Sequence, residues 1–352
     1  MPPKVSVNIA CYNHEKYIGQ ALQSVLDQTF QDVEIFVLNN GSTDNSLRVI
    51  ESYKDSRIHV ESVFPNKQST WAGRYLMEKS TGEYVALLCS DDVWEKDKLQ
   101  KQVEYLNSHP QAGAVFTRVQ PMGDRGQLIH NPKNHYHRQF NTLSNRTAPL
   151  WLRDIWQRAD HSFCCSSALI RREVLKESNY YDVRLKYIQD MTLWADILTK
   201  YEVYILDEKL TKMRYFSNHT NLSAGSLKTS FAILNESFVL YEQFKKMKDI
   251  KQFLEFMPQT REYFSCLESQ YIPFYLAILT IKACPKIHFK QAALKDLYDQ
   301  MALKESRDSL ERNFNFTHLD LYRLSEEFYP NVWKQNVLGR MFPFLKGRMS
   351  FK

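Results

Sequence analysis

Residues 5–89 alternate between short apolar runs and segments with helical periodicity, and this alternation limits the fold more than any other feature of the sequence. We predict strands over residues 5–10 and 33–38, because each is a short run rich in apolar and β-branched side chains. Between them, apolar side chains recur at helical spacing over residues 18–26. The pattern therefore predicts a βαβ unit with two parallel strands.

The same alternation continues with a strand over 58–63, a helix over 71–79 and a strand over 84–89. Repeated units of this kind predict an α/β fold, in which a mostly parallel central sheet is flanked by helices. Ligands of such sheets bind at the carboxyl ends of the strands. Three polar segments fall at those ends and form the candidate site: residues 11–13, 39–42 and 89–92.

We predict three regions in the chain. Residues 1–120 form the first half of the α/β domain, and residues 121–225 form its second half, beginning with a polar, turn-rich connection over 121–150. Residues 226–352 contain few glycines and have helical periodicity, which predicts a helical C-terminal extension.

The overall charge excludes several classes of protein. The chain has 46 Lys and Arg against 40 Asp and Glu, and the resulting net charge of +6 is spread along the sequence, so we expect no nucleic-acid groove. The six cysteines form no C-x-x-C pair, which argues against structural zinc and favours reduced thiols in a cytoplasmic protein. The longest apolar stretch, residues 271–284, contains Pro273 and is too short to span a membrane.

Four motifs carry a resemblance to a known family. VSVNIACYN at 5–13, SVLDQTF at 24–30, NNGSTD at 39–44 and SDDVW at 90–94 occur in the order and spacing that resemble the nucleotide-sugar half of glycosyltransferase family 2. The resemblance extends over residues 4–225, including the segments SSALIRR and QDMTLW. It implies the GT-A fold and an inverting enzyme that transfers a hexosyl or N-acetylhexosaminyl group.

Asp91 and Asp92 are the predicted metal ligands. They follow a buried strand, and carboxylate oxygens there suit Mg²⁺ or Mn²⁺, which neutralises a departing diphosphate. The family usually has a further Asp where this chain has Cys89, so the carboxylate that the resemblance places at the ribose is missing. Asp91 is then the metal ligand by position, with Asp92 as its neighbour or substitute. Alternatively, the two aspartates cap a helix that begins near Lys96.

The nucleotide is predicted to lie at the first two strand ends. There, Tyr12 and Asn13 can stack on and hydrogen-bond a pyrimidine. Asn39 and Asn40 replace two aspartates of the family pattern, and an amide accepts or donates according to its orientation. UDP is the first choice of nucleotide, while dTDP, CDP and GDP stay open, as does a purely turn-forming role for the asparagines. By resemblance, the nucleotide-sugar site comprises Ala10, Tyr12, Asn13, Asn39, Asn40, Ser90, Asp91, Arg214 and His219.

Arg214 and His219 resemble a polar loop that closes over the diphosphate in related enzymes. Phe216 stands where a histidine often follows the arginine, so His219 is a displaced candidate for that role. The alternative is that His219 is an ordinary solvated loop residue.

Asp190 is the predicted catalytic base. Inversion needs a group that takes the proton of the acceptor hydroxyl, and Asp190 occupies the position of the family's Glu-Asp pair, with Gln189 replacing the glutamate. A following helix would favour its ionised form. The alternatives are that Asp190 only caps that helix, or that Asp182 or Asp160 supplies the base.

The implied function is non-processive transfer of one sugar to a glycan hydroxyl, because the chain lacks the membrane helices and the Q-x-x-R-W motif of processive relatives. Similar relatives imply a lipooligosaccharide, O-antigen or capsule acceptor in bacteria, including lipid-linked glycans. A second hypothesis is a degenerate relative that binds nucleotide sugar or glycan without turnover, prompted by the lost acidic residues. A nicotinamide-dependent oxidoreductase is excluded, because no G-x-G-x-x-G follows the first strand.

Residues 331–352 combine basic and aromatic side chains without an acidic residue. Basic side chains can meet anionic lipid headgroups while aromatic ones insert beneath them, so we expect peripheral contact with the inner face of the plasma membrane. The alternative is that the aromatic side chains pack on the catalytic domain.

Overall fold

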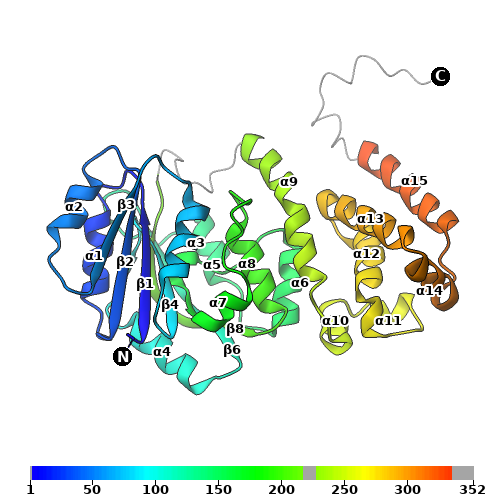
Figure 1. Ribbon diagram of the computed structural model, residues 1–352, viewed down its shortest axis with the longest axis horizontal. Helices are drawn as coiled ribbons and strands as arrows, with labels where there is room; N and C mark the ends of the chain where they lie inside the picture. Colours follow the sequence, from blue (N-terminus) through cyan, green and yellow to red (C-terminus); the bar gives the residue numbers. More distant parts are fainter. Residues whose placement is uncertain (1, 217–226, 335–352) are drawn as a thin grey trace, which may run out of the picture. The chain divides into compact units, whose positions relative to one another are not determined.

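The computed structural model describes residues 2–216 and 227–334, and the chain divides into two compact units. The first comprises Met1–Ile155 and Asp160–Glu236, and the second comprises Trp156–Ala159 and Ser237–Lys352. The first unit contains the sheet, whereas the described part of the second is helical (Figure 1). His219 and residues 335–352 of the basic tail lie outside the described residues.

An eight-stranded sheet organises the first unit, with strand order β3-β2-β1-β4-β7-β6-β8-β5. Strand β1 lies parallel to β2 and β4, and β2 lies parallel to β3, which confirms the predicted α/β fold. The other half is mixed, because β7 is antiparallel to both β4 and β6, β6 and β8 are parallel, and β5 is antiparallel to β8. The strands are β1 (Val5–Cys11), β2 (Val33–Asn40), β3 (Ile58–Val63), β4 (Tyr84–Cys89), β5 (Val93–Trp94), β6 (Ala112–Met122), β7 (Leu169–Arg171) and β8 (Glu202–Arg214).

Helices cover both faces of the parallel part of the sheet. Alternate residues of a strand point to opposite faces, so apolar side chains on both sides need cover. Leu38 of β2 packs with α3, whereas Val7 and Ile9 of β1 belong to the cluster that includes α1 and α4. The helices of this unit are α1 (Ile18–Leu26), α2 (Ser46–Ser52), α3 (Ser69–Lys79), α4 (Lys98–Ser108), α5 (His135–Asn141), α6 (Ala148–Arg158), α7 (Arg172–Glu177) and α8 (Gln189–Leu198).

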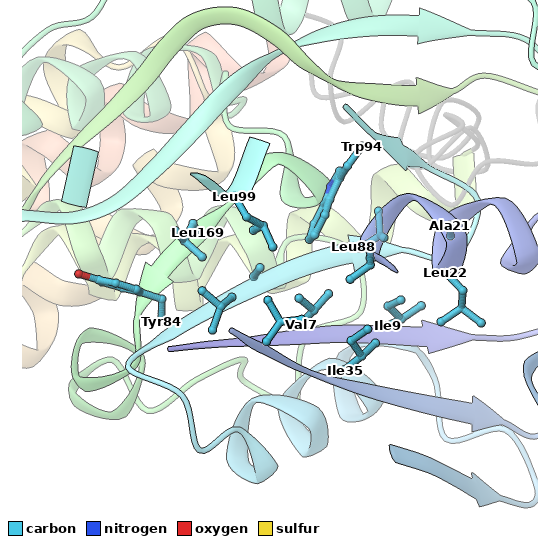
Figure 2. Close-up of a cluster of buried hydrophobic side chains, with 14 of the residues drawn as sticks. Val7, Ile9, Ala21, Leu22, Ile35, Tyr84, Leu88, Trp94, Leu99 and Leu169 are labelled. Carbon is cyan, nitrogen blue, oxygen red and sulfur yellow. The ribbon is translucent and has the colours of Figure 1, made fainter. Parts of the chain in front are cut away.

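The largest part of this core joins strands and helices that are distant in sequence. Figure 2 shows Ile9, Ile35 and Leu88 projecting from three strands toward the same side as Leu22 of α1. Each of these side chains is almost fully buried, and burying a Leu or Ile contributes about 1.5–3 kcal/mol. This packing fixes the strands, and therefore the loops that leave their carboxyl ends.

The structure differs from the sequence prediction between the two halves of the sheet. The predicted connection over 121–150 contains helix α5, whose N-terminus is capped by the Asn134 side chain, which accepts from the amides of the next turn. Tyr136 and Phe140 are buried, and their spacing of four residues places them on one face of α5. The polar residues on the remaining face concealed this short helix. Further along the chain, a 3₁₀ turn over Cys165–Ser167 leads into the short strand β7.

The second unit confirms the predicted helical extension. Its helix α12 is apolar and buried on all sides, so it forms the centre of this unit. Helix α9 begins in the first unit and ends in the second, which starts at Ser237. Within residues 2–216 and 227–334, no helix is both long enough and apolar enough to cross a membrane. The helices are α9 (Leu227–Phe244), α10 (Ile250–Phe256), α11 (Thr260–Tyr263), α12 (Ile272–Ala283), α13 (Ile287–Ala302), α14 (Lys304–Phe314) and α15 (His318–Lys334).

Candidate active site

The three polar segments predicted from the sequence meet at one edge of the sheet. The parallel register pairs Cys11 with Asn39 and Ala10 with Cys89, so the carboxyl ends of β1, β2 and β4 are level. The backbone amide of Asn13 donates to the Ser42 hydroxyl at 3.0 Å, which joins the first two loops. The order of the strands therefore places residues 11–13, 39–42 and 89–92 side by side.

Asp92 is a buried carboxyl group held at both oxygens. Its Oδ2 accepts a hydrogen bond from the Ser166 hydroxyl, and its Oδ1 accepts one from the Arg214 backbone amide at 2.8 Å. Burial raises its pKa, and the charge of Asp91 raises it further, to about 8, although the Ser166 and Arg214 hydrogen bonds act in the opposite direction. The interpretation that the aspartate pair caps the next helix is wrong, because β5 intervenes and α4 begins only at Lys98.

Ser166 is a site residue whose role the sequence did not indicate. Besides donating to Asp92, its hydroxyl accepts from the Cys89 amide at 3.0 Å, and its carbonyl accepts from the Trp94 indole N–H at 2.6 Å. Trp94 is buried in the core of the sheet. Ser166 therefore connects the Asp92 carboxylate to the end of β4 and to the core.

Asp91 presents a carboxylate that makes no hydrogen bond with another side chain in the described part of the chain. The side chain is half-buried, and burial raises its pKa, whereas the charges of His14 and Arg214 lower it. One oxygen of Asp91, one of Asp92 and the Cys89 sulfur all lie within 4.8 Å of one another. Two adjacent carboxylates with raised pKa values fit a divalent cation, and Asp91 is the one with unoccupied oxygens.

Arg214 donates to backbone and side-chain oxygens of the described residues. Its side chain is almost fully buried, and its guanidinium lies 4.6 Å from the centre of the Tyr17 ring. The guanidinium donates to four oxygens, which are the carbonyls of Asp91, Gly123 and Asp124 and the side-chain oxygen of Gln20. In this structure Arg214 therefore ties the metal-side loop to the loop of Gly123 and Asp124 and to helix α1, while its predicted role at the nucleotide-sugar diphosphate stays a prediction.

His14 is a second site residue that sequence reasoning missed. Its Nδ1 lies 2.8 Å from the Ser90 hydroxyl, and its positive form would stabilise the Asp91 carboxylate. Its ring lies edge-on to Tyr17 and 6.4 Å from the ring of Phe216. The signal for His14 is its place directly after the Tyr-Asn pair at the end of β1. An imidazole thus lies beside Phe216, and it comes from the segment that follows β1.

The asparagines at the end of β2 bind the surrounding loops. Asn39 Oδ1 accepts from the Ser42 amide at 3.3 Å. Asn40 Oδ1 accepts from the Lys67 amide at 3.0 Å, and its Nδ2 donates to the Gln68 carbonyl at 3.2 Å. Asn40 therefore has the turn-forming role that the sequence left open. Asn39 has it as well, and its Nδ2 also donates to the Ser62 hydroxyl of β3 at 3.4 Å.

Tyr12 and Asn13 lie at the rim of the same edge. Asn13 has a positive φ of 54°, and its Oδ1 accepts from the Thr43 amide at 2.8 Å. Tyr12 is 46% exposed, so one face of its ring is available to a ligand. Ala10 is the residue of β1 paired with Cys89, so its backbone lies beside the start of the metal-side loop.

Asp190 is the second residue of α8 and is paired with a histidine. Its Oδ1 accepts from the Met191 amide at 2.8 Å, and its Oδ2 lies 3.4 Å from His161 Nε2. His161 Nδ1 accepts from the Phe163 amide at 3.2 Å, so this hydrogen bond assigns the ring proton to Nε2, facing Asp190. Burial raises the pKa of Asp190, but His161 and the amide outweigh it and hold that pKa below its usual value. The carboxylate is ionised at neutral pH and is able to accept a proton.

The two alternative carboxylates are engaged in local structure. Asp182 is paired with Arg184 at 2.6 Å, which lowers its pKa. Asp160 accepts from the Gln139 side chain at 2.9 Å and from the His161 amide at 2.8 Å. Neither carboxylate has the environment of Asp190, whose Oδ2 lies beside the His161 imidazole.

The raised pKa of Asp92 predicts a pH-dependent stability in chelator. The folded state binds this proton more tightly than the unfolded state, so the associated stability is complete below about pH 4 and is lost as the pH rises through about 8. As the pH rises from about 4 to about 8, we expect the free energy of unfolding of the natural chain to fall relative to that of the Asp92→Asn variant. Bound Mn²⁺ should make this fall smaller. Urea unfolding at pH 5 and pH 8, with EDTA or Mn²⁺, measures this difference. Equal pH dependence of the two proteins in EDTA would contradict it.

Comparisons with known proteins agree with this architecture. The family model described as "Glycosyl transferase family 2" matches residues 6–178. The Bacillus subtilis protein named "Putative teichuronic acid biosynthesis glycosyltransferase TuaG" is 28% identical over 256 residues, covering 71% of this chain and 91% of the relative. A Haemophilus influenzae protein named "Uncharacterized glycosyltransferase" is 36% identical over 106 residues, which cover 30% of this chain and 42% of that protein.

Solved structures share the fold at low sequence identity. The crystal structure of S. aureus TarS 1-349 in complex with UDP has a TM-score of 0.56 and 16% identity, and the match covers 87% of this chain and 91% of that one. A second structure of the same protein, in complex with UDP-GlcNAc, has a TM-score of 0.55 and covers 95% of this chain and 92% of that one. At this identity the similarity establishes the arrangement of strands and helices.

Proposed function

The chain belongs to glycosyl transferase family 2 and is a glycosyltransferase, and from this premise we propose that it moves one sugar per reaction from a nucleotide-sugar donor to a glycan hydroxyl. The observation that carries the proposal is the Asp91 carboxylate at the carboxyl ends of β1, β2 and β4, which no other side chain of the described residues holds by a hydrogen bond, next to the fixed Asp92. Such a pair suits a donor whose leaving group is a charged diphosphate.

In the proposed reaction the acceptor oxygen attacks the anomeric carbon from the face opposite the diphosphate, with inversion. The new carbon–oxygen bond forms as the bond to the diphosphate breaks, and the nucleoside diphosphate leaves with the bonding electrons. Asp190 takes the hydroxyl proton, and His161 keeps the Asp190 carboxylate ionised and oriented. Asp91, beside Asp92, would hold Mg²⁺ or Mn²⁺, which neutralises negative charge on the diphosphate.

UDP is the proposed nucleotide of the donor. The exposed Tyr12 ring offers a stacking face at the rim, and the solved TarS structures of the same fold are complexes with UDP and UDP-GlcNAc. Asn39 and Asn40 leave dTDP, CDP and GDP open, because neither supplies the carboxylate that the family pattern has at this position.

We propose cell-surface polysaccharide as the acceptor class, because TuaG is named for teichuronic acid biosynthesis. Lipooligosaccharide, O-antigen and capsule acceptors stay open within this class. Peripheral contact with the inner face of the plasma membrane through residues 331–352 stays a prediction from sequence. Most of these residues, 335–352, lie outside the described part of the structure.

A panel of nucleotide sugars tests the function. We expect a UDP-sugar with Mn²⁺ or Mg²⁺ to raise the melting temperature, because a ligand at one hundred times its dissociation constant stabilises a protein by about 2.7 kcal/mol. Release of free UDP from the stabilising donor then separates an enzyme from the alternative, a degenerate relative that binds without turnover. The proposal fails if no nucleotide sugar stabilises the protein, and stabilisation without release would favour the binding hypothesis.

A further inference from the structure

Glu236 of α9 binds three consecutive backbone amides immediately before the helix that carries Asp190. Its Oε1 accepts from the Lys186 amide at 2.9 Å, and its Oε2 accepts from the amides of Tyr187 and Ile188 at 2.9 and 3.2 Å. These three residues lead directly into α8, which begins at Gln189. The contact joins segments that are about fifty residues apart in sequence.

The start of α8 lacks a local partner for these donors. Ile188 is the N-cap residue, and its side chain cannot accept a hydrogen bond from the backbone. Amides at a helix start have no acceptor within the helix, and a carboxylate there is favoured both by hydrogen bonding and by the helix dipole. Glu236 therefore binds, from another helix, the amide of the N-cap residue and the two amides that precede it.

The position of Asp190 depends on where α8 starts. Asp190 is two residues beyond Ile188, and its carboxylate contacts the Met191 amide of the same first turn. Its remaining oxygen must lie within reach of His161 Nε2, at 3.4 Å. A shift of the first turn would move the carboxylate away from His161 and from an acceptor hydroxyl.

We propose that Glu236 is a positioning residue for Asp190, acting through the three amides of residues 186–188. The inference rests on the proposed function, in which Asp190 is the base. Glu236 lies in α9, after the segment that resembles the family. Under this proposal, sugar transfer depends on this residue as well as on Asp190. The hydrogen bonds of Glu236 within the described residues go to backbone amides, so its proposed effect is on the geometry of the base and not on the donor.

Two substitutions and a matched control test this role. Glu236→Ala removes both acceptor oxygens, whereas Glu236→Gln retains one of them and serves if the alanine variant does not fold. Glu242→Gln is the control, because Glu242 lies on the same helix, is exposed and, within the described residues, pairs with Lys245 at the surface. UDP with Mn²⁺ is the binding probe in calorimetry, and turnover is followed as UDP released to water from the UDP-sugar found active in the panel.

We expect Glu236→Ala to lower the rate constant for UDP release about tenfold or more, because small displacements of a reacting group have large effects on rate. The loss for Glu236→Gln should be smaller and in the same direction. UDP affinity should stay within about twofold in all variants, and the control should turn over at the natural rate. A natural turnover rate in both Glu236 variants would overturn the proposal.

A double-mutant cycle separates positioning from general destabilisation. If Glu236 acts through Asp190, then adding Glu236→Ala to Asp190→Asn should cause no further loss of turnover, because the two effects share one pathway. A further loss equal to that of Glu236→Ala alone would overturn the proposal. Natural turnover of Asp190→Asn itself would instead refute Asp190 as the base, and the inference with it, so the two failures are distinguishable.

Discussion

Asp190→Asn should lower turnover by about a hundredfold or more while leaving donor affinity almost unchanged. The amide keeps the shape of the side chain, but it cannot accept a proton from the acceptor hydroxyl at neutral pH. Comparing rate with binding is informative, because the hydrogen-bonding partners of Asp190 within the described residues are His161 and its own helix. Turnover and calorimetry with the same donor measure the two quantities.

Asp182→Asn is the matched control for this experiment. Asp182 is also a partly buried carboxylate of the second half of the sheet domain, but it is paired with Arg184. We expect this variant to retain most of its activity. Normal turnover of Asp190→Asn, with loss of activity in Asp182→Asn, would transfer the role of base to Asp182.

Asp91→Ala should also lower turnover at least about a hundredfold, which corresponds to about 2.7 kcal/mol of transition-state stabilisation. Asp91 makes no side-chain hydrogen bond within the described residues, so its loss should leave the melting temperature nearly unchanged. Asp92→Ala should lower the rate as well, but it also removes acceptors from Ser166 and Arg214 and should destabilise the fold. Rates, melting temperatures and Mn²⁺ binding by calorimetry distinguish the two variants.

Asp97→Asn is a suitable control, because Asp97 lies in the same stretch of chain and pairs with Lys101 at the surface. It should bind Mn²⁺ and turn over as the natural protein does. The metal mechanism would be refuted if the protein with both Asp91 and Asp92 replaced by Ala were fully active in EDTA.

The sequence predicts the first half of the sheet well because its strands are short and apolar. It does not reveal β6, although all eleven residues of that strand are buried. Thr117 and Arg118 interrupt the apolar run, and each has a partner from the chain segment of β8: Thr117 pairs with Thr211 at 3.0 Å, and Arg118 pairs with Asp207. Polar residues that satisfy one another across strands do not produce the alternation by which a strand is recognised.

The same limit applies to the candidate site. Residue types at strand ends, together with the family resemblance, are enough to select Asp91, Asp92 and Asp190. The partners that determine their charge and orientation come from distant segments, such as Ser166, which is 74 residues from Asp92. No local pattern indicates such a pair, because it exists only once the sheet has formed.

Helix α9 also affects how this chain could be recombined with its relatives. The boundary between the two compact units falls after Glu236, whereas the family resemblance ends at residue 225. A chimera joined at residue 225 would replace Glu236 together with the C-terminal unit. A junction after residue 236 would retain Glu236. A chimera that exchanges the C-terminal unit between homologues should therefore stay active when it is joined after residue 236, and lose activity when it is joined at residue 225.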